Sequence, residues 1–464
     1  MKNIIWFFVL PLLGLLTASI GRAADNRFPI QLLTFSAAKE QQAHQLAADL
    51  NLKLAPEVWQ FFQAADQGDL PTVTNIFWRL RARAGQYEGS MNDASVASPV
   101  WQPLLEVELA LNLFALGGTN YPVAFGMGII RSIPAGSIYF GGTDPGRGLV
   151  TALCKSQIKA DPFFTLTQNA LADDRYVTYL RRMYGDRIHL PTTNDTQNAF
   201  AEFTKDLQRR VDHDRDFPNE PRQVKPGENY QMVDGKLQVS GQVAVMEING
   251  LIVKNIFDHN PDREFYVEES FPLDWMYPYL EPHGLILKLK RVPRPQLTTA
   301  ALDADRAFWA KQCGAMLGDW LKPETSVSNV CAFAEAVYAA KDLSRFTGDI
   351  GFVTNEFATK SYSKLRSSLG GLYQWRLTSK ADTGDKTRLR TETDYAFKQA
   401  FALCPTSPEA IYRYVNFLLS QNRTDDAIRI ARTARKMQPD NEQLTALLSQ
   451  LLDYRQQQKM KAAK

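Results

Sequence analysis

The chain has 464 residues, of which 45% are hydrophobic and 22% are charged. This length is enough for about two to four domains, and the composition is that of a folded protein rather than a disordered one. The formal net charge is only +3, which excludes the broad basic footprint of a general nucleic-acid-binding protein.

The first residues have the pattern of a secretory signal. Lys2 precedes "NIIWFFVLPLLGLLTASIG", which carries no charge before Arg22. Small residues at Gly21 and Ala23 suit a cleavage site, so residues 1–23 are predicted to be a signal peptide that is removed. The protein is then expected in the periplasm or outside the cell, with no transmembrane domain. The alternative is that the segment stays as an N-terminal anchor in the inner membrane.

Residues 24–118 are predicted to be a helical region. Apolar side chains recur at helical spacing on both sides of the break "DQGDLP", which predicts a helical hairpin. These positions are Val58, Phe61, Phe62 and Ala65 before the break and Val73, Ile76, Phe77 and Leu80 after it. A further apolar helix, "WQPLLEVELALNLFAL", is expected to stop at Gly117 and Gly118.

Short apolar runs alternate with helical segments over residues 119–295. This alternation predicts a central α/β domain with a mostly parallel sheet. Strands are expected at 137–140, 163–167, 263–269 and 284–291, and helices at 147–158, 173–184, 243–258 and 273–281. The segment "ENYQMVDGKLQV" predicts a β-hairpin, because Asp234-Gly235 suits a tight turn between alternating strands.

The segment "IYFGGTDPGRG" follows the first strand of this domain. Ligands of open α/β sheets bind outside the carboxyl ends of strands, so Thr143, Asp144 and Arg147 are candidates for a ligand pocket. The spacing of the glycines matches neither phosphate-binding fingerprint. The alternative is a structural role, in which Thr143 or Asp144 caps a helix and Pro145 takes its first position.

Two later strands are also expected to end in polar side chains. Gln168 and Asn169 follow the second strand, and Glu268 ends a third. Together with the first loop they would form a pocket for a polar ligand such as a glycan, although capping by Asp173 is the structural alternative for the second strand end.

Metal and nucleophile patterns are weak in this chain. The four cysteines have no C-x-x-C spacing, and no two of the five histidines stand four residues apart. No metal, no cofactor and no catalytic residue is therefore predicted. Outside the cytoplasm Cys313 and Cys331 could pair, or all four cysteines could be buried thiols.

Residues 296–390 are predicted to be helical, residues 391–455 to be repeats, and residues 456–464 to be a basic tail. Ala400 and Pro405 recur 34 residues later as Ala434 and Pro439. This spacing, with small residues at helix contacts and Pro after a helix, resembles the tetratricopeptide repeat. The first helix of such a unit commonly contacts the partner protein, which makes Tyr412, Arg413 and Asn416 candidate partner-binding residues.

Three segments of the central region together form a further pattern. The first has a polar loop after a strand, the second has a strand with a polar end, and the third ends in a late "GL" strand. They read "IYFGGTDPGR", "DPFFTLTQNALADDRYVTYLRRMYGDRI" and "FYVEESFPLDWMYPYLEPHGLILKL". The pattern resembles the soluble C-terminal region of bacterial protein O-mannosyltransferase-like membrane proteins, a domain of unknown function that tetratricopeptide units often follow. In that resemblance Asp144 best matches the family loop.

The segments "KLRSS" (Lys364–Ser368) and "FALCPTSPEA" (Phe401–Ala410) are similar to a Verrucomicrobia-type set of secreted proteins with no established activity. The mannosyltransferase-like members carry a multi-span membrane domain that this sequence lacks, so transferase activity does not carry over. We therefore expect an exported, envelope-associated protein that binds a protein partner through its repeats and has no catalysis of its own. The alternative is an accessory α/β domain that binds or processes glycans.

Overall fold

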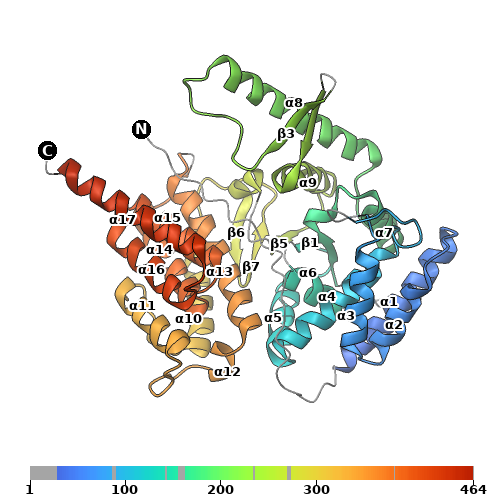
Figure 1. The fold of residues 1–464 in the computed structure, drawn as a ribbon, viewed down its shortest axis with the longest axis horizontal. Helices are drawn as coiled ribbons and strands as arrows, with labels where there is room; N and C mark the ends of the chain where they lie inside the picture. The colour runs from blue at the N-terminus through green and yellow to red at the C-terminus, as the bar shows by residue number, and fades with distance from the viewer. Residues whose placement is uncertain are drawn as a thin grey trace. The chain divides into compact units, whose positions relative to one another are not determined.

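The computed structural model describes residues 29–85, 90–141, 144–154, 162–233, 236–268, 273–380 and 382–462. These residues are mostly helical (Figure 1). They form two compact units, the first of Met1–Ala115 with Ile133–Phe265 and the second of Leu116–Ser132 with Tyr266–Lys464. The predicted signal peptide lies outside the described residues, and the predicted domain boundaries stay predictions.

The first unit begins with helices that the apolar periodicity predicted. They are α1 (Ile30–Asp49), α2 (Pro56–Asp66), α3 (Leu70–Arg81) and α4 (Trp101–Gly117). All the predicted apolar positions of α2 and α3 are buried, and the two helices pack against each other, which confirms the helical hairpin. Asp69 caps α3 by accepting a hydrogen bond from the Thr72 N–H. The last helix of the group ends at Gly117 as predicted, and Gly118 follows with a φ of +65°.

The βαβα alternation is confirmed in the first unit. It comprises β1 (Ile138–Gly141), α6 (Asp144–Leu153), β2 (Phe164–Thr167) and α7 (Asp174–Tyr184). Strands β1 and β2 are parallel, and Gly141 lies opposite Thr167 at their carboxyl ends. Asp173 caps α7, as its position after the second strand predicted, because its side chain accepts from the Arg175 N–H.

The main sheet is small and mixed rather than mostly parallel. Its strand order is β2-β1-β5-β7-β6, with β5 at Phe265–Val267, β6 at Leu280–His283 and β7 at Ile286–Leu289. The parallel expectation holds for β1 and β2, but β6 and β7 are antiparallel. Only Gly284 and Leu285 join them, and so short a connection cannot make the crossover that parallel strands need. The segment before them, expected to be a short helix, is the 3₁₀ helix η4 (Asp274–Tyr279).

A second, two-stranded sheet lies in the first unit beside two long helices. It consists of β3 (Asn229–Val233) and β4 (Lys236–Ser240), and their antiparallel pairing confirms the predicted hairpin, whose turn is outside the described residues. The neighbouring helices are α8 (Thr193–Asp216) and α9 (Gly241–His259). The sequence did not predict α8, because its buried stripe is narrow and mixes apolar with polar residues.

The second unit contains α5 (Asn120–Ile130) and the helices from α10 onward. The latter are α10 (Thr299–Leu317), α11 (Val327–Ala334), α12 (Ile350–Val353), α13 (Glu356–Thr378), α14 (Lys386–Leu403), α15 (Pro408–Ser420), α16 (Thr424–Met437) and α17 (Glu442–Ala462). From α13 to α17 each helix packs against the next one. Helices α14 and α16 end 34 residues apart, and α15 and α17 begin 34 residues apart. The helices therefore repeat with the predicted period, and α17 runs through most of the predicted basic tail.

All four cysteines are buried free thiols, so Cys313 and Cys331 do not form a disulfide. Burial raises the pKa of Cys313 to about 12 and that of Cys331 to about 11. Within the described ranges no helix has the length and apolar character needed to cross a bilayer. In the same ranges, no group of three or more His, Cys, Asp or Glu side chains could hold a metal ion.

Candidate functional site

The carboxyl ends of β1 and β2 lie side by side, as the candidate pocket requires. Because Gly141 faces Thr167, Gln168 follows at the same edge of the sheet. The Gln168 side chain is only 1% exposed, and neither its amide nitrogen nor its amide oxygen has a hydrogen-bond partner in the described part of the chain. Asn169, the next residue, is exposed. A buried amide without partners is costly, so this position is the most unusual of the predicted strand-end residues.

Arg147 points away from its own helix and reaches α4. Its Nη2 donates a hydrogen bond of 2.9 Å to Oε1 of Gln102, and its guanidinium lies 6.0 Å from the centre of the Tyr176 ring. The Nε atom is buried and has no partner among the described residues. The side chains of Thr143 and Asp144 lie outside the described set, so the choice between capping and ligand binding stays open for them.

Glu268 directly follows β5 and is 2% exposed. It belongs to the second unit, whereas Arg147 and Gln168 belong to the first. The convergence of three strand ends on one pocket therefore stays a prediction.

The sequence did not predict a buried ion pair that lies close to Tyr176. Lys39 of α1 is 1% exposed, and its Nζ lies 2.5 Å from Oε2 of Glu106 on α4. The Tyr179 hydroxyl joins both groups, accepting from Lys39 at 2.7 Å and donating to Glu106 at 2.8 Å. Burial, followed by the negative charge of Glu106, raises the pKa of Tyr179 well above its ordinary value. The signal was present, because Lys39 occupies the buried face of α1 together with Phe35 and Ala43.

The second candidate site is on the C-terminal helices. A stripe of residues on α13 and another on α15 are exposed or half-buried. We call them the α13–α15 surface, and they are Lys360, Lys364, Gly371, Glu409, Arg413 and Asn416. The two helices are joined there by Lys364 and Glu409, whose Nζ and Oε1 are 4.0 Å apart, and by Arg413, which donates to the Ser367 carbonyl at 3.1 Å.

The predicted partner-binding residues take different positions in this arrangement. Arg413 and Asn416 lie on the α13–α15 surface, whereas the side chain of Tyr412 is largely buried, at 8% exposure for the residue. Burial raises the pKa of Tyr412. The helical period of α15 placed all three residues near one another, but it could not decide how far each one is covered.

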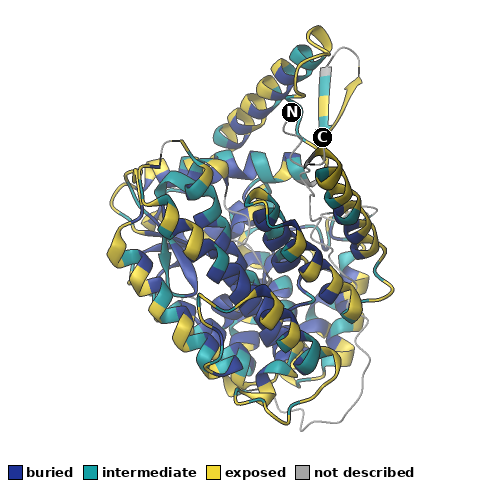
Figure 2. Ribbon diagram, turned by 90° about the vertical axis from the view of Figure 1, so that its left-hand side faces the viewer, coloured by how far each residue is buried: buried dark blue, intermediate teal, exposed yellow. Residues whose placement is uncertain are grey.

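Other parts of the same chain cover the second helix of each pair. Helix α14 packs against α10 and α11, and α16 packs against α11. The contact on α16 includes polar bonds, because Glu335 accepts hydrogen bonds from Thr433 at 2.7 Å and from Lys436 at 2.6 Å. Figure 2 shows exposed and buried residues alternating along the C-terminal helices. Helices α14 and α16 are therefore covered by α10 and α11. The α13–α15 surface lies on the other helix of each pair.

Residues 395–451 match the family model of the tetratricopeptide repeat. The match runs from the second half of α14 through α15 and α16 into α17. No curated protein and no solved structure matches the chain, and nothing in these comparisons supports the resemblance to mannosyltransferase-like or Verrucomicrobia-type proteins. The match and the 34-residue spacing of the helices agree, and the C-terminal part of this chain carries tetratricopeptide repeats.

Proposed function

We propose that this protein is an exported, envelope-associated scaffold that binds a protein partner through its C-terminal repeats. The tetratricopeptide match over residues 395–451 supports this role, because such repeats stack into extended surfaces that bind other proteins. The observation that carries the proposal is the α13–α15 surface, which stays accessible while α10 and α11 cover α14 and α16.

The chemistry of this surface favours a polar peptide or protein segment as the bound partner. Lys360 and Lys364 form ion pairs with Glu356 and Glu409, so charges of both signs lie here, and Asn416 supplies an amide that both donates and accepts. Arg413 donates to the Ser367 carbonyl, which fixes the position of its guanidinium on this surface. Tyr412 lies largely within the helix stack and acts as a support for this stripe of α15.

Site-specific photo-crosslinking tests the proposal. A photoreactive residue is placed at Lys360 or at Asn416 in the full chain, and the protein is incubated with an extract of the cell envelope. The matched control carries the same residue at Arg432, which is exposed on α16. We expect one discrete crosslinked partner from Lys360 and Asn416 and none from Arg432.

A double variant of the α13–α15 surface makes the test quantitative. Lys360→Gln combined with Asn416→Ala alters two side chains outside the buried helix core, since the Lys360 side chain is 51% exposed and pairs with Glu356 one turn away, and Asn416 is half-buried. Partner binding should fall while the thermal unfolding temperature stays the same. Equal crosslinking at Arg432, or unchanged binding by the double variant, would argue against this surface as the binding site.

Export rests on the sequence of the N-terminus and has its own test. Expression of the full chain in a bacterium with an outer membrane should yield a periplasmic protein whose first residue is Ala24. Mass spectrometry of the purified protein measures this directly. A protein that retains residues 1–23 and sediments with the inner membrane would instead support the anchored alternative.

A second candidate function, binding of a glycan at the ends of β1 and β2, is favoured by the state of Gln168. Its fully buried amide lacks partners, and amide groups commonly bind sugar hydroxyls. A glycan array compares the wild type with Asp144→Ala and Gln168→Met. Loss of one binding signal in both variants supports this function, and an array without signal for the wild type removes it.

A further inference from the structure

The β3–β4 hairpin has one apolar and one polar face. Tyr230 lies opposite Val239 and Met232 lies opposite Leu237, and residues that face each other across an antiparallel pair point to the same side. The other side is mostly polar and carries Gln231 opposite Gln238, Asn229 opposite Ser240 and Val233 opposite Lys236. The hairpin is therefore amphipathic in the way expected of a sheet with one covered face.

The side chains of the apolar face are more covered on β4 than on β3. Helices α8 and α9 contact β4, where Leu237 and Val239 are half-buried, and α9 also contacts β3. All five residues of β3 are exposed, with Tyr230 at 41% and Met232 at 54% (Figure 2). Among the described residues β3 pairs only with β4, so its other edge offers unpaired backbone N–H and C=O groups.

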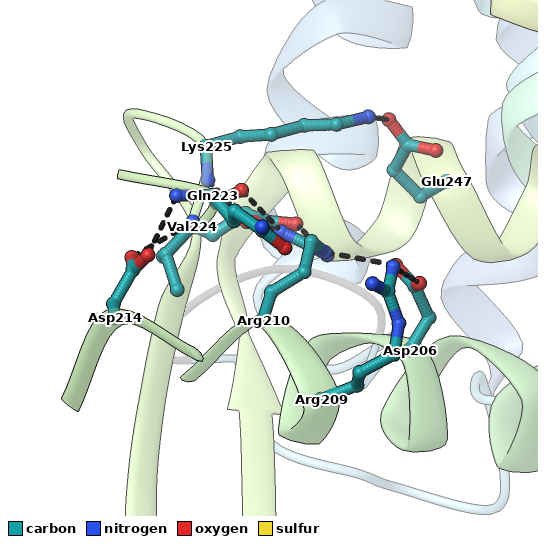
Figure 3. Close-up of polar contacts among 9 residues, drawn as sticks. Asp206, Arg209, Arg210, Asp214, Gln223, Val224, Lys225 and Glu247 are labelled. Carbon is teal, nitrogen blue, oxygen red and sulfur yellow. Dashed lines mark hydrogen bonds and ion pairs between the residues drawn. The ribbon is translucent and has the colours of Figure 1, made fainter. Parts of the chain in front are cut away.

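Charged contacts hold the base of this hairpin against α8. Arg210 of α8 binds Glu228 through both guanidinium nitrogens, and Nη2 lies 2.7 Å from Oε1. The Asp214 carboxylate accepts hydrogen bonds from the N–H groups of Gln223 at 2.7 Å and Val224 at 3.0 Å (Figure 3). The segment leading into β3 is therefore fixed at several points.

A further ion pair connects the same segment to the helix that follows the hairpin. Lys225 reaches across to Glu247 of α9, with Nζ and Oε1 2.6 Å apart, as Figure 3 shows. The segment that leads into β3 is thus tied to both α8 and α9. The exposed strand is held in place rather than being the end of a loose loop.

Strand β3 has none of the features that usually protect a free edge. Its sequence, "NYQMV", contains no charged residue and no proline. Natural edge strands are commonly blocked by lysine, proline or a covering element, and a sheet of two strands gains stability when further strands are added. Because β3 is uncharged, two copies of it can approach each other without like-charge repulsion.

We propose that β3 is a self-association edge, at which a second copy of this chain adds its own β3 antiparallel to form a continuous four-stranded sheet. Full overlap of the five residues sets the register. Gln231 then faces the partner's Gln231, and Tyr230 faces the partner's Met232. This register keeps the apolar face continuous across the two-fold axis, so that each Tyr230 covers the partner's Met232. The proposal concerns the first unit and does not depend on the repeats.

Analytical ultracentrifugation of the full chain over a range of concentrations tests the proposal. The wild type should dimerise. Gln231→Lys and Gln231→Glu should each raise the dimer dissociation constant by about fivefold or more, because like charges directly opposite each other destabilise a strand pair. A mixture of the two variants should recover the wild-type constant, since the lysine and the glutamate then face each other.

The matched control is Gln238→Lys. Gln238 lies on the same polar face as Gln231 but on β4, away from the free edge, so this variant should dimerise like the wild type. Amide hydrogen exchange needs no variant, because the amides of β3 that face away from β4, which alternate along the strand, should become protected as the concentration rises. A wild type that stays monomeric, a dimer insensitive to charge at Gln231, or pairing of β3 with another protein instead of itself would each overturn the proposal.

Discussion

Gly370 of α13 lies directly against the ring of Phe397 on α14. A Cβ atom on Gly370 would come within 2.8 Å of Cε1 and 2.9 Å of Cδ1 of that ring, which is closer than carbon atoms normally approach. Phe397 is fully buried and cannot move aside easily. The absence of a side chain at Gly370 thus allows the close approach of α13 and α14.

Gly370→Ala should lower the free energy of unfolding by about 1–3 kcal/mol, because the added methyl overpacks the contact with Phe397. Gly371 is the matched control. A Cβ atom there meets the tip of the flexible Arg413 side chain, at 3.2 Å from Nη1. Gly371→Ala should therefore be neutral or stabilising by up to about 1 kcal/mol, since alanine favours the helix. Urea unfolding of both variants measures the difference, and equal effects would contradict the close contact.

The buried pair of Lys39 and Glu106 predicts a large effect of removing one charge. Lys39→Met leaves the Glu106 carboxylate buried without its cation and should cost about 3–5 kcal/mol of stability. The double variant Lys39→Met with Glu106→Leu should recover most of this loss, because both charges are then gone. Chemical denaturation followed by circular dichroism measures each value.

An exposed ion pair of the same unit serves as the control for Lys39. Arg182 and Asp49 lie 3.6 Å apart between Nη1 and Oδ2, with side chains 49% and 40% exposed. Arg182→Met should change stability by no more than about 1 kcal/mol, because exposed pairs are screened by water. If Lys39→Met and Arg182→Met lose similar amounts of stability, burial does not determine the contribution of the pair of Lys39 and Glu106.

Glu335 predicts a pH dependence of the contact between η5 (Glu335–Ala339) and α16. The hydrogen bond from Lys436 is the largest influence and lowers the pKa of Glu335 below its ordinary value of 4.5; burial opposes it, and the hydrogen bond from Thr433 adds to the lowering. A lowered pKa in the folded state means that the contact stabilises the protein above pH 4.5 and loses this effect as the pH falls through the lowered pKa. Glu335→Gln should therefore be less stable than the wild type at neutral pH, and the difference should shrink in acid. A difference that stays constant over this range would contradict the ionic contact.

Replacement of Gln168 is expected to stabilise the folded protein, which is unusual for a buried residue. Gln168→Met removes two unpartnered buried polar atoms at similar volume, and the expected change is neutral to a gain of about 1–3 kcal/mol. The comparison residue is Gln399, which is also fully buried but accepts a hydrogen bond of 2.8 Å from Nε of Arg366. Gln399→Met should destabilise, because it takes a partner from a buried guanidinium. Thermal unfolding of the two variants in parallel gives the sign of each change, and a destabilised Gln168→Met would point to a partner for the amide.

Much of the local architecture could be predicted because it is encoded by residues close together in the chain. The apolar spacing of α2 and α3, the strand and helix alternation from β1 to α7 and the hairpin of β3 and β4 all extend over fewer than fifty residues each. The 34-residue recurrence of Ala400 and Ala434 likewise predicted helix pairs, and both residues are fully buried at helix contacts. Helices α5 and α8 were not predicted, because the residues close together in their sequences show no clear apolar periodicity.

The candidate sites were predicted less completely, because exposure and pairing depend on segments that are distant in sequence. The register of β1 and β2 brings Gln168 to the predicted edge, but nothing near Gln168 in the chain reveals that its amide lacks partners. Tyr412 is on the expected stretch of α15 and is nevertheless largely covered by its neighbours.

Periodicity and turn chemistry within the chain were thus sufficient for many of the elements, for the 34-residue repeat and for the β3–β4 hairpin, since each arises from neighbouring residues. Three features required the folded arrangement: the pairing of Lys39 with Glu106, the contact that excludes a side chain at Gly370, and the free edge of β3. Each depends on which distant segment comes to lie against a given residue. Burial and close packing are properties of such long-range contacts, and no short stretch of sequence specifies them.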